Sequence, residues 1–204
     1  MAGATNKPYG LKPLRYLNGT PWNGAVTQYI VDGATDLFIG DAVVLTGTSG
    51  AAGLTVSGID CQGLPYVTAA AAGATLLGVC VGVIPTQATD GIYHASGTHI
   101  ALVVDDPFVV FRIQEDGDTS SIVVGDVGEN ADIIATTGDT TTGISKHVLD
   151  SSDHKTATAQ LRILRLARSD SGTVNNISTA GAAGNYADFE VLINEHMFNQ
   201  AAGI

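Results

Sequence analysis

Short apolar runs recur along most of the chain, and clusters of turn-forming residues separate them. Each run has roughly four to ten residues rich in Val, Ile or Thr, with Gly, Asp, Asn or Ser between runs, which is typical of strands joined by turns. The predicted strands are 28–31, 37–47, 64–70, 75–84, 99–104, 108–113, 121–124, 131–138 and 159–167. Repeated short strands predict a mainly β fold, built as a compact sandwich or barrel.

The composition favours strands over helices in the same way. Of 204 residues, 25 are glycine, 45% are hydrophobic and only 14% are charged. Because the usual charged fraction is about 25%, this chain is too apolar to be disordered. A helical bundle would need more Lys and Glu. The length suits one well-packed domain, or a domain with long arms.

The first thirty residues differ from the rest of the chain. They contain Pro8, Pro13 and Pro21, which remove backbone donors and disfavour helix in the residue before them. We therefore expect residues 1–30 to form an extended N-terminal arm that leads into a β-domain over 31–168.

The end of the chain forms a third region. Residues 167–185 are polar, small and rich in glycine, which predicts a flexible loop or linker. We expect residues 169–204 to form this loop and a C-terminal arm with its own apolar face. The spacing of Phe189, Ile193 and His196 suits a helix, but the apolar residues of 189–193 also alternate as in a strand. The hydrophobic period therefore does not distinguish a helix from a strand here. Residues 138–155 are predicted to hold one short helical turn.

Charge placement excludes one broad class of function. The net charge is −11, and no Lys or Arg occurs between Arg15 and Arg112, an interval that holds seven acids. A nucleic-acid binder needs clustered basic residues to neutralise phosphates. We therefore expect no binding to nucleic acid or to an anionic membrane.

Residues 61–89 carry no charge, which raises the question of a membrane span. Glycine and proline interrupt this stretch repeatedly, whereas a spanning helix needs about 20 predominantly apolar residues. The first residues contain no apolar signal segment, so we expect a soluble protein made inside the cell. Cys80 lies in an apolar run and is predicted to be a buried inert thiol, although a bridge to Cys61 stays open.

The stretch 105–116, "DDPFVVFRIQED", places acid pairs on both sides of an apolar run. As a strand over 107–115, it points Val109, Phe111 and Ile113 to one face. The acid pairs are then roughly 30 Å apart along the chain, too far to act on one bond. We interpret them as solvated turn acids and the stretch between them as a core strand.

Other motifs for chemistry are weak. Asp116, Asp118 and Ser120 resemble the start of a calcium loop, but the required glycine and bidentate Glu are missing, so a looser calcium site is only the alternative to a solvated turn. His147 and His154 are predicted to be solvated rather than metal ligands. No nucleophile elbow, phosphate-binding loop or zinc-spaced Cys/His set occurs. We therefore expect no enzyme activity and no cofactor or metal.

The chain as a whole resembles the head decoration (cement) proteins of tailed bacteriophages. The segments that carry this resemblance are "YGLKPLRYLNGTPWNGA", "DLFIGDAVVL", "LLGVCVGVIP", "VVDDPFVVFRIQED", "DVGENADIIATTGDTTTGISKHVLDSS", "TATAQLRILRL" and "GNYADFEVLINEHMF". It implies a compact β-sandwich or tulip-like β-barrel with extended arms, assembled as homotrimers or dimers. It also implies a virion protein, made in the host cytoplasm, that binds the outer capsid surface and clamps neighbouring major capsid subunits of the expanded head.

Aromatic residues and Arg are the usual anchors of interfaces, so the arms supply the candidate contacts to the capsid or to a neighbouring subunit. The candidates are Tyr9, Leu11, Leu14, Arg15, Tyr16, Trp22, Phe189, Ile193, His196 and Phe198. In the alternative interpretation, both arms pack on their own domain. Two rival functions stay open: another β-rich virion component, such as a tail or host-surface-binding protein, and a β-barrel enzyme with a deep polar pocket.

Overall fold

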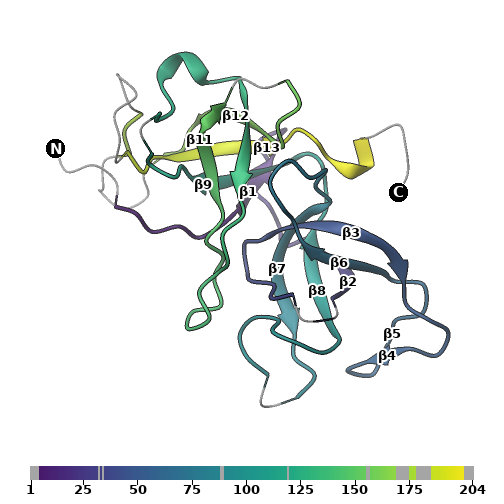
Figure 1. The fold of residues 1–204 in the computed structure, drawn as a ribbon. Helices are drawn as coiled ribbons and strands as arrows, with labels where there is room; N and C mark the ends of the chain where they lie inside the picture. Colours follow the sequence, from purple (N-terminus) through teal and green to yellow (C-terminus); the bar gives the residue numbers. More distant parts are fainter. Residues whose placement is uncertain are drawn as a thin grey trace.

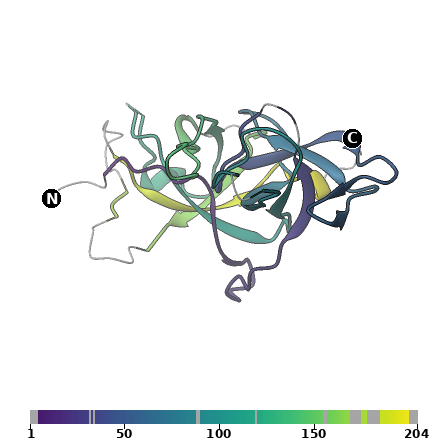
Figure 2. The same cartoon turned by 90° about the horizontal axis from the view of Figure 1, so that it is seen from below.

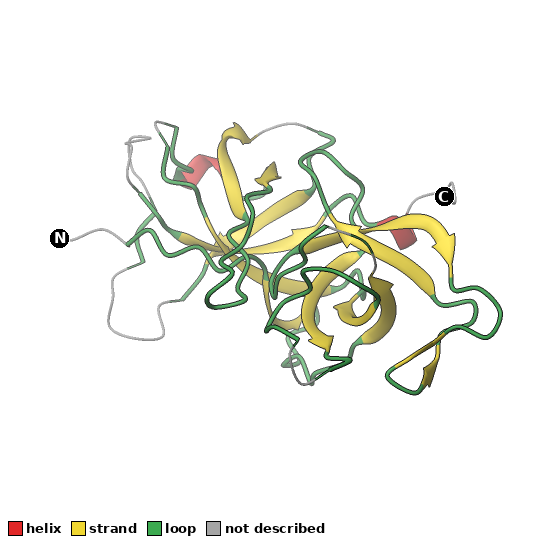
Figure 3. Ribbon diagram, turned by 60° about the horizontal axis from the view of Figure 1, so that its bottom comes forward, coloured by secondary structure: helices red, strands yellow, loops and turns green. Residues whose placement is uncertain are grey.

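The computed structural model describes residues 5–31, 33, 35–87, 90–118, 120–154, 157–168, 175–177 and 185–199. Strands and loops make up almost all of this part of the chain, and Figure 3 shows them in yellow and green. Two single-turn 3₁₀ helices, η1 (Val124–Asp126) and η2 (Met197–Asn199), are the helical segments of the described residues. The predicted mainly β fold is confirmed.

One part of the molecule is a closed barrel of five strands (Figure 1). In barrel order these are β2 (Thr27–Val31), β6 (Pro65–Ala69), β3 (Ala42–Ser49), β7 (Gly78–Ile84) and β8 (His99–Val104). β2 and β6 are parallel, and the other neighbours are antiparallel. A small hairpin of β4 (Thr55–Val56) and β5 (Ile59–Asp60) lies in the connection from β3 to β6.

The other part is a six-stranded antiparallel sheet. Its order is β1 (Lys12–Tyr16), β9 (Val109–Gln114), β13 (Asp188–Ile193), β12 (Leu161–Leu166), β10 (Asn130–Ile134) and β11 (Val148–His154). Beyond β9, Glu115 forms a parallel bridge with Leu149 of β11, so the sheet curls back on itself.

The barrel and the sheet share one hydrophobic core. The side chain of Cys80 packs inside the barrel, whereas its neighbour Val79 packs in the core of the sheet, and Val103 and Val104 of β8 divide in the same way. Strands buried on both faces have continuous apolar sequences, as the first half of β7 and most of β8 do. Cys61 and Cys80 are both buried free thiols, so the bridge that the sequence left open is absent.

The two terminal segments are extended, as expected, but their strands belong to the sheet. β1 is an edge strand paired with β9, and β13 lies between β9 and β12 near the middle of the sheet. The strand alternative for 189–193 is therefore the one that the structure adopts. Most of the predicted loop 167–185 lies outside the described residues.

One local prediction was wrong, and one strand was missed. Residues 121–124 do not form a strand, because the backbone N–H of Val123 donates to the Asp126 carboxylate at 2.8 Å and turns the chain into η1. The short turn expected within 138–155 is present at 140–143, where the Gly143 N–H donates to the Asp139 carbonyl at 2.7 Å, but the strand β11 that follows it was not predicted. β11 is held by pairing with β10 and by Ser151, whose hydroxyl donates to Asp116 at 2.6 Å. Side-chain bonds of this kind compete with the local pattern.

The stretch 105–116 contains the predicted core strand, β9. The carboxylate of Asp106 accepts a hydrogen bond from the Phe108 backbone N–H at 2.8 Å, so this acid belongs to a turn as expected. Glu115 is different, because its side chain is buried rather than solvated. The prediction of solvated ends is therefore wrong at Glu115, where the curl of the sheet toward β11 covers the carboxyl group.

Burial raises the pKa of Glu115 to about 7, although three donors favour its charged form. These donors are the backbone N–H groups of Ile122 at 3.0 Å and Ala187 at 3.2 Å, and the side-chain amide of Asn185 at 2.5 Å. The three hydrogen bonds offset part of the cost of removing a carboxylate from water, but all three come from neutral donors.

We expect the stability of the protein to fall between pH 5 and pH 8 because of Glu115. Its pKa is raised above the ordinary value of 4.5, so its stabilising contribution is complete below that value and is lost as the pH rises through about 7. The expected loss is about 2 kcal/mol. Chemical denaturation of the wild type and of Glu115→Gln at both pH values measures it. The free energy of unfolding of the variant should not show this drop between the two pH values. An equal drop in both proteins would contradict the assignment of the effect to Glu115.

Candidate functional site

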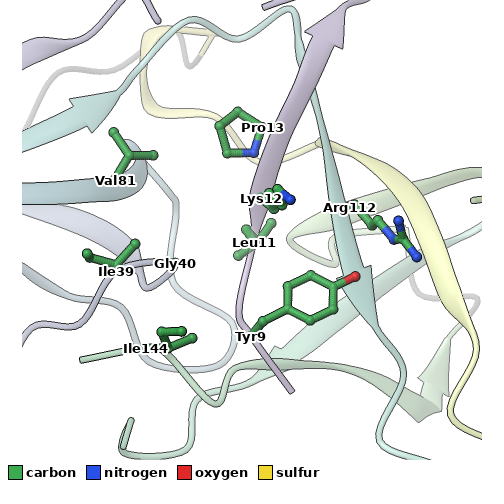
Figure 4. A pocket seen from close by; sticks show the side chains of 9 residues that line it. All are labelled: Tyr9, Leu11, Lys12, Pro13, Ile39, Gly40, Val81, Arg112 and Ile144. Atoms are coloured by element: carbon green, nitrogen blue, oxygen red, sulfur yellow. The ribbon is translucent and has the colours of Figure 1, made fainter. Parts of the chain in front are cut away.

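A groove about 480 Å³ in volume lies between the edge strand β1 and the barrel. Figure 4 shows its lining side chains, which come from the segment before β1, from β1, β7 and β9, and from two loops of the barrel and the sheet. The lining residues are Tyr9, Leu11, Lys12, Pro13, Ile39, Gly40, Val81, Arg112 and Ile144. Segments far apart in the sequence therefore form one apolar depression.

Two glycines allow the N-terminal segment to pack closely against the barrel beside this groove. Gly10 and Gly40 both have positive φ, at 70° and 99°, a backbone conformation that residues other than glycine rarely adopt. A Cβ atom on Gly10 would lie 2.3 Å from the Gly40 carbonyl oxygen, so only glycine permits this approach. The backbone N–H of Leu11 then donates to the same carbonyl at 2.8 Å.

Two polar side chains of the groove, those of Tyr9 and Arg112, bind the same carboxylate. The Tyr9 hydroxyl donates to Asp188 at 2.7 Å, and the Arg112 guanidinium pairs with the same carboxylate at 2.6 Å. Burial, followed by the charge of Asp188, raises the pKa of Tyr9 well above its ordinary range. Tyr9 thus stays protonated and does not serve as a base.

Two partly exposed isoleucines line the groove, and a third lies near one of them. Ile39 and Ile144 are 39% and 41% exposed, and their backbones form a parallel bridge. Ile92, 56% exposed, packs against Gly143 next to Ile144. Figure 1 shows the β10–β11 loop, which carries Ile144, reaching from the sheet to the barrel. Exposed apolar side chains gathered at one place are typical of a contact surface.

A second apolar surface lies at the other end of β1. A depression of about 490 Å³ is lined by Tyr16, Leu17, Asn18, Asp106 and Phe108, and we call it the β1-end patch. Leu17 and Phe108 are 47% and 57% exposed, and the backbone N–H of Leu17 donates to the Phe108 carbonyl at 2.7 Å. The following loop, residues 17–26, projects from the body in purple in Figure 2.

The ten predicted contact residues divide into two groups. Four of them are buried in the subunit itself, so the prediction that they contact a partner is wrong for this conformation: Leu11, Phe189, Ile193 and His196. Their segments are part of the sheet or pack against the barrel, which covers their side chains. The other six keep exposed surface: Tyr9, Leu14, Arg15, Tyr16, Trp22 and Phe198.

Arg15 is less available than its exposure suggests. Its guanidinium pairs with Glu190 at 2.8 Å, and Arg165 pairs with the same carboxylate at 2.9 Å. Burial alone would raise the pKa of Glu190, but the hydrogen bonds from Arg165 and Arg15 hold it below its ordinary value. Arg15 therefore anchors β1 to β13 across β9 in the subunit.

Sequence reasoning missed the most exposed apolar residues of both surfaces. Phe108 falls within the predicted strand 107–115, yet it precedes β9 and lies in a turn. Ile39 and Ile144 come together only because two distant loops pair. The signal available in the sequence was an apolar residue next to turn residues, which is too common to single them out.

His147 and His154 are not the solvated residues that the sequence predicts. His147 is 3% exposed; its Nε2 lies 3.4 Å from Asp41, and its Nδ1 accepts from the Ala42 backbone N–H at 3.3 Å. Burial lowers the pKa of His147 and raises that of Asp41, and the two join the barrel to the sheet. Within the described chain, one group of side chains has the composition to hold a metal ion: Asp126, Glu129 and His154.

The fold and these surfaces define an all-β protein with an apolar groove and an apolar patch along one edge strand. No protein-family model matches the chain, and searches of the curated proteins and of the solved structures likewise find no match. In the part of the chain that the structure describes, no helix has the length and apolar character needed to span a bilayer.

Proposed function

We propose that this protein is a structural virion component that binds the outer surface of a phage capsid. It stabilises the expanded head by clamping neighbouring major capsid subunits, acts without catalysis, and assembles with itself as a trimer. The proposal rests on the resemblance in sequence to head decoration proteins. The observation that supports it is the presence of two apolar surfaces at the two ends of the edge strand β1.

The chemistry of these surfaces favours a protein partner. Tyr9 and Arg112 in the groove are bound to Asp188, whereas two partly exposed isoleucine side chains also line the groove. Apolar side chains with aromatic neighbours are the usual core of a protein interface. The net charge of −11 disfavours the packaged nucleic acid as the partner.

The outer edge of β1 is largely occupied by the same chain. β1 pairs with β9 on one side; on the other, the Leu11 N–H donates to Gly40, the Leu14 carbonyl accepts from Trp22, and Pro13 has no N–H. The groove therefore offers a partner side-chain contacts rather than an open strand edge. Contacts of this kind suit a capsid lattice because many weak contacts act together.

Co-sedimentation with expanded heads of the parent phage, prepared without this protein, tests the proposal. We expect saturable binding at a copy number that matches the symmetry of the head. Sedimentation of the free protein should show a trimer. No binding to expanded heads would contradict the proposal, and binding to host cells instead would identify a tail or host-surface-binding protein.

Trp22→Ala is expected to weaken binding to expanded heads by about tenfold. Trp22 is half-buried in the projecting loop, and its indole N–H donates to the neighbouring Ala25 carbonyl at 3.3 Å. The ring also packs against the edge of the main hydrophobic core, so we expect its removal to lower stability somewhat as well as to take away contact area. The same binding assay measures the loss, and Val26→Ala in the same loop is the control. A variant that no longer folds would show that Trp22 serves the subunit rather than the interface.

A further inference from the structure

We propose that Asp126, Glu129 and His154 bind one divalent transition-metal ion, with Zn²⁺ the preferred ion. Asp126 ends η1, Glu129 directly precedes β10, and His154 ends β11. One donor atom from each residue lies within 4.8 Å of the other two. The fold thus brings two carboxylates and an imidazole together around a single point. The site is separate from both apolar surfaces.

His154 is oriented as metal-bound histidines are. Its Nδ1 lies 2.5 Å from the Ser151 carbonyl oxygen, which can only accept a hydrogen bond, so Nδ1 carries a proton. The other ring nitrogen, Nε2, faces the Asp126 carboxylate at 3.1 Å. Nε2 is thus the ring nitrogen directed at the carboxylates, and a backbone carbonyl on the other ring nitrogen is the usual outer partner of a ligand histidine.

The distances suit a small ion. Zinc is bound at about 2.0–2.1 Å by histidine and about 2.0–2.2 Å by carboxylates, so neighbouring ligand atoms around a tetrahedral ion lie about 3.4 Å apart. The 3.1 Å between Nε2 of His154 and Oδ2 of Asp126 is close to that value. A slight outward movement of the side chains would accommodate the ion.

The burial of carboxylate oxygens at this site favours a bound cation. Asp126 is 2% exposed, although one of its oxygens accepts from the Val123 backbone N–H at 2.8 Å. Glu129 Oε2 is shielded from solvent and accepts no hydrogen bond from the residues that the structure describes. A carboxylate oxygen in such a place is costly unless a charge or a donor compensates it. A bound metal ion would compensate it directly.

The backbone holds the ligands in position without help from an ion. Gly128 has a φ of 101° and reverses the chain between Asp126 and Glu129. The Gly128 N–H donates to the Ile163 carbonyl at 2.8 Å, and the Ile163 N–H donates to the Glu129 carbonyl at 2.9 Å. These bonds fix the turn to β12, so metal binding needs little further ordering.

The donor set selects the class of ion. One imidazole nitrogen and two carboxylate oxygens suit a first-row divalent metal, whereas Ca²⁺ requires six to eight oxygens. The Irving–Williams order places Zn²⁺ above Mn²⁺ for such a site. Because the ligands come from η1, the turn before β10 and the end of β11, the ion would fasten the η1 turn to the edge of the sheet.

Titration of the metal-free protein with ZnCl₂, followed by calorimetry, tests this site. We expect one strong site per chain, at least tenfold weaker in both Glu129→Gln and His154→Gln, and unchanged in Asp153→Asn. Asp153 is an exposed carboxylate next to His154 that lies outside the cluster, so it controls for nonspecific charge. Zn²⁺ should also raise the thermal midpoint of the wild type but not of the two ligand variants. Circular dichroism establishes that each variant is folded.

Two further results would overturn the proposal. Equal zinc binding by the wild type and both ligand variants would place the ion at other histidines. The absence of saturable binding by the wild type would exclude the site altogether. Anomalous scattering from zinc-soaked wild-type crystals decides the matter even if both variants fail to fold, because the ion must lie among these three side chains. Stronger binding of Ca²⁺ than of Zn²⁺ would contradict the assigned class of ion.

Discussion

Phe189→Ala is expected to lower the free energy of unfolding by about 3–5 kcal/mol. Phe189 is fully buried in β13, where it lies opposite Ile113 of β9 and Leu166 of β12. Removing its ring leaves a cavity in the core that the sheet and the barrel share, and the surrounding strands cannot close it without shifting. Chemical denaturation followed by circular dichroism measures the loss.

Phe198→Ala is the matched control for that substitution. Phe198 lies in the same C-terminal region, in η2, but is 57% exposed. We expect this variant to change the stability of the isolated protein by less than about 0.5 kcal/mol. A small effect at Phe189 would mean that the C-terminal segment leaves the sheet in solution. It would then be the separate arm that its sequence position suggests.

The double variant Leu17→Asp/Phe108→Asp is expected to weaken binding to expanded heads by more than about 100-fold. Leu17 and Phe108 form the exposed apolar part of the β1-end patch. Two central anchors of an interface each contribute about 2 kcal/mol or more, and a carboxylate in place of each side chain adds a desolvation cost. Co-sedimentation of the variant with heads measures the loss.

Val124→Asp is the control for this double variant. Val124 is 65% exposed on η1, so it tests the effect of a new carboxylate on an apolar surface position outside the patch. It should bind heads as the wild type does, and all variants should retain their folded spectra. If the double variant still binds normally, the groove at the other end of β1, around Ile39 and Ile144, becomes the expected contact.

The assignment of strands shows where local pattern is sufficient. Alternation and turn residues predicted β9 and most barrel strands, because apolar periodicity and glycine-rich turns depend on neighbouring residues alone. The 189–193 segment could not be assigned, since helix and strand periods coincide over five residues. Tertiary pairing with β9 and β12 made it a strand.

The errors at 121–124, β11 and Glu115 have a common physical cause. In each case the backbone conformation or the burial of the residue depends on a group outside the local apolar pattern. That group is either a side chain distant in sequence or a carboxylate three residues away. Asp126 turns 121–124 into the start of η1, and Asp116 holds Ser151 of β11. Glu115 is buried only because β11 returns to the end of β9.

The same distinction holds for the candidate sites. The sequence by itself determined the mainly β class, the core strand in 105–116 and the terminal segments as places to search for contacts, since these depend on composition and short-range pattern. Only the tertiary structure decided which terminal residues remain exposed, how Ile39 meets Ile144, and that Glu129 lies beside His154. The reason is physical: exposure and ligand geometry depend on the packing of distant segments, and the packing of a sheet against a barrel is not encoded in any one segment.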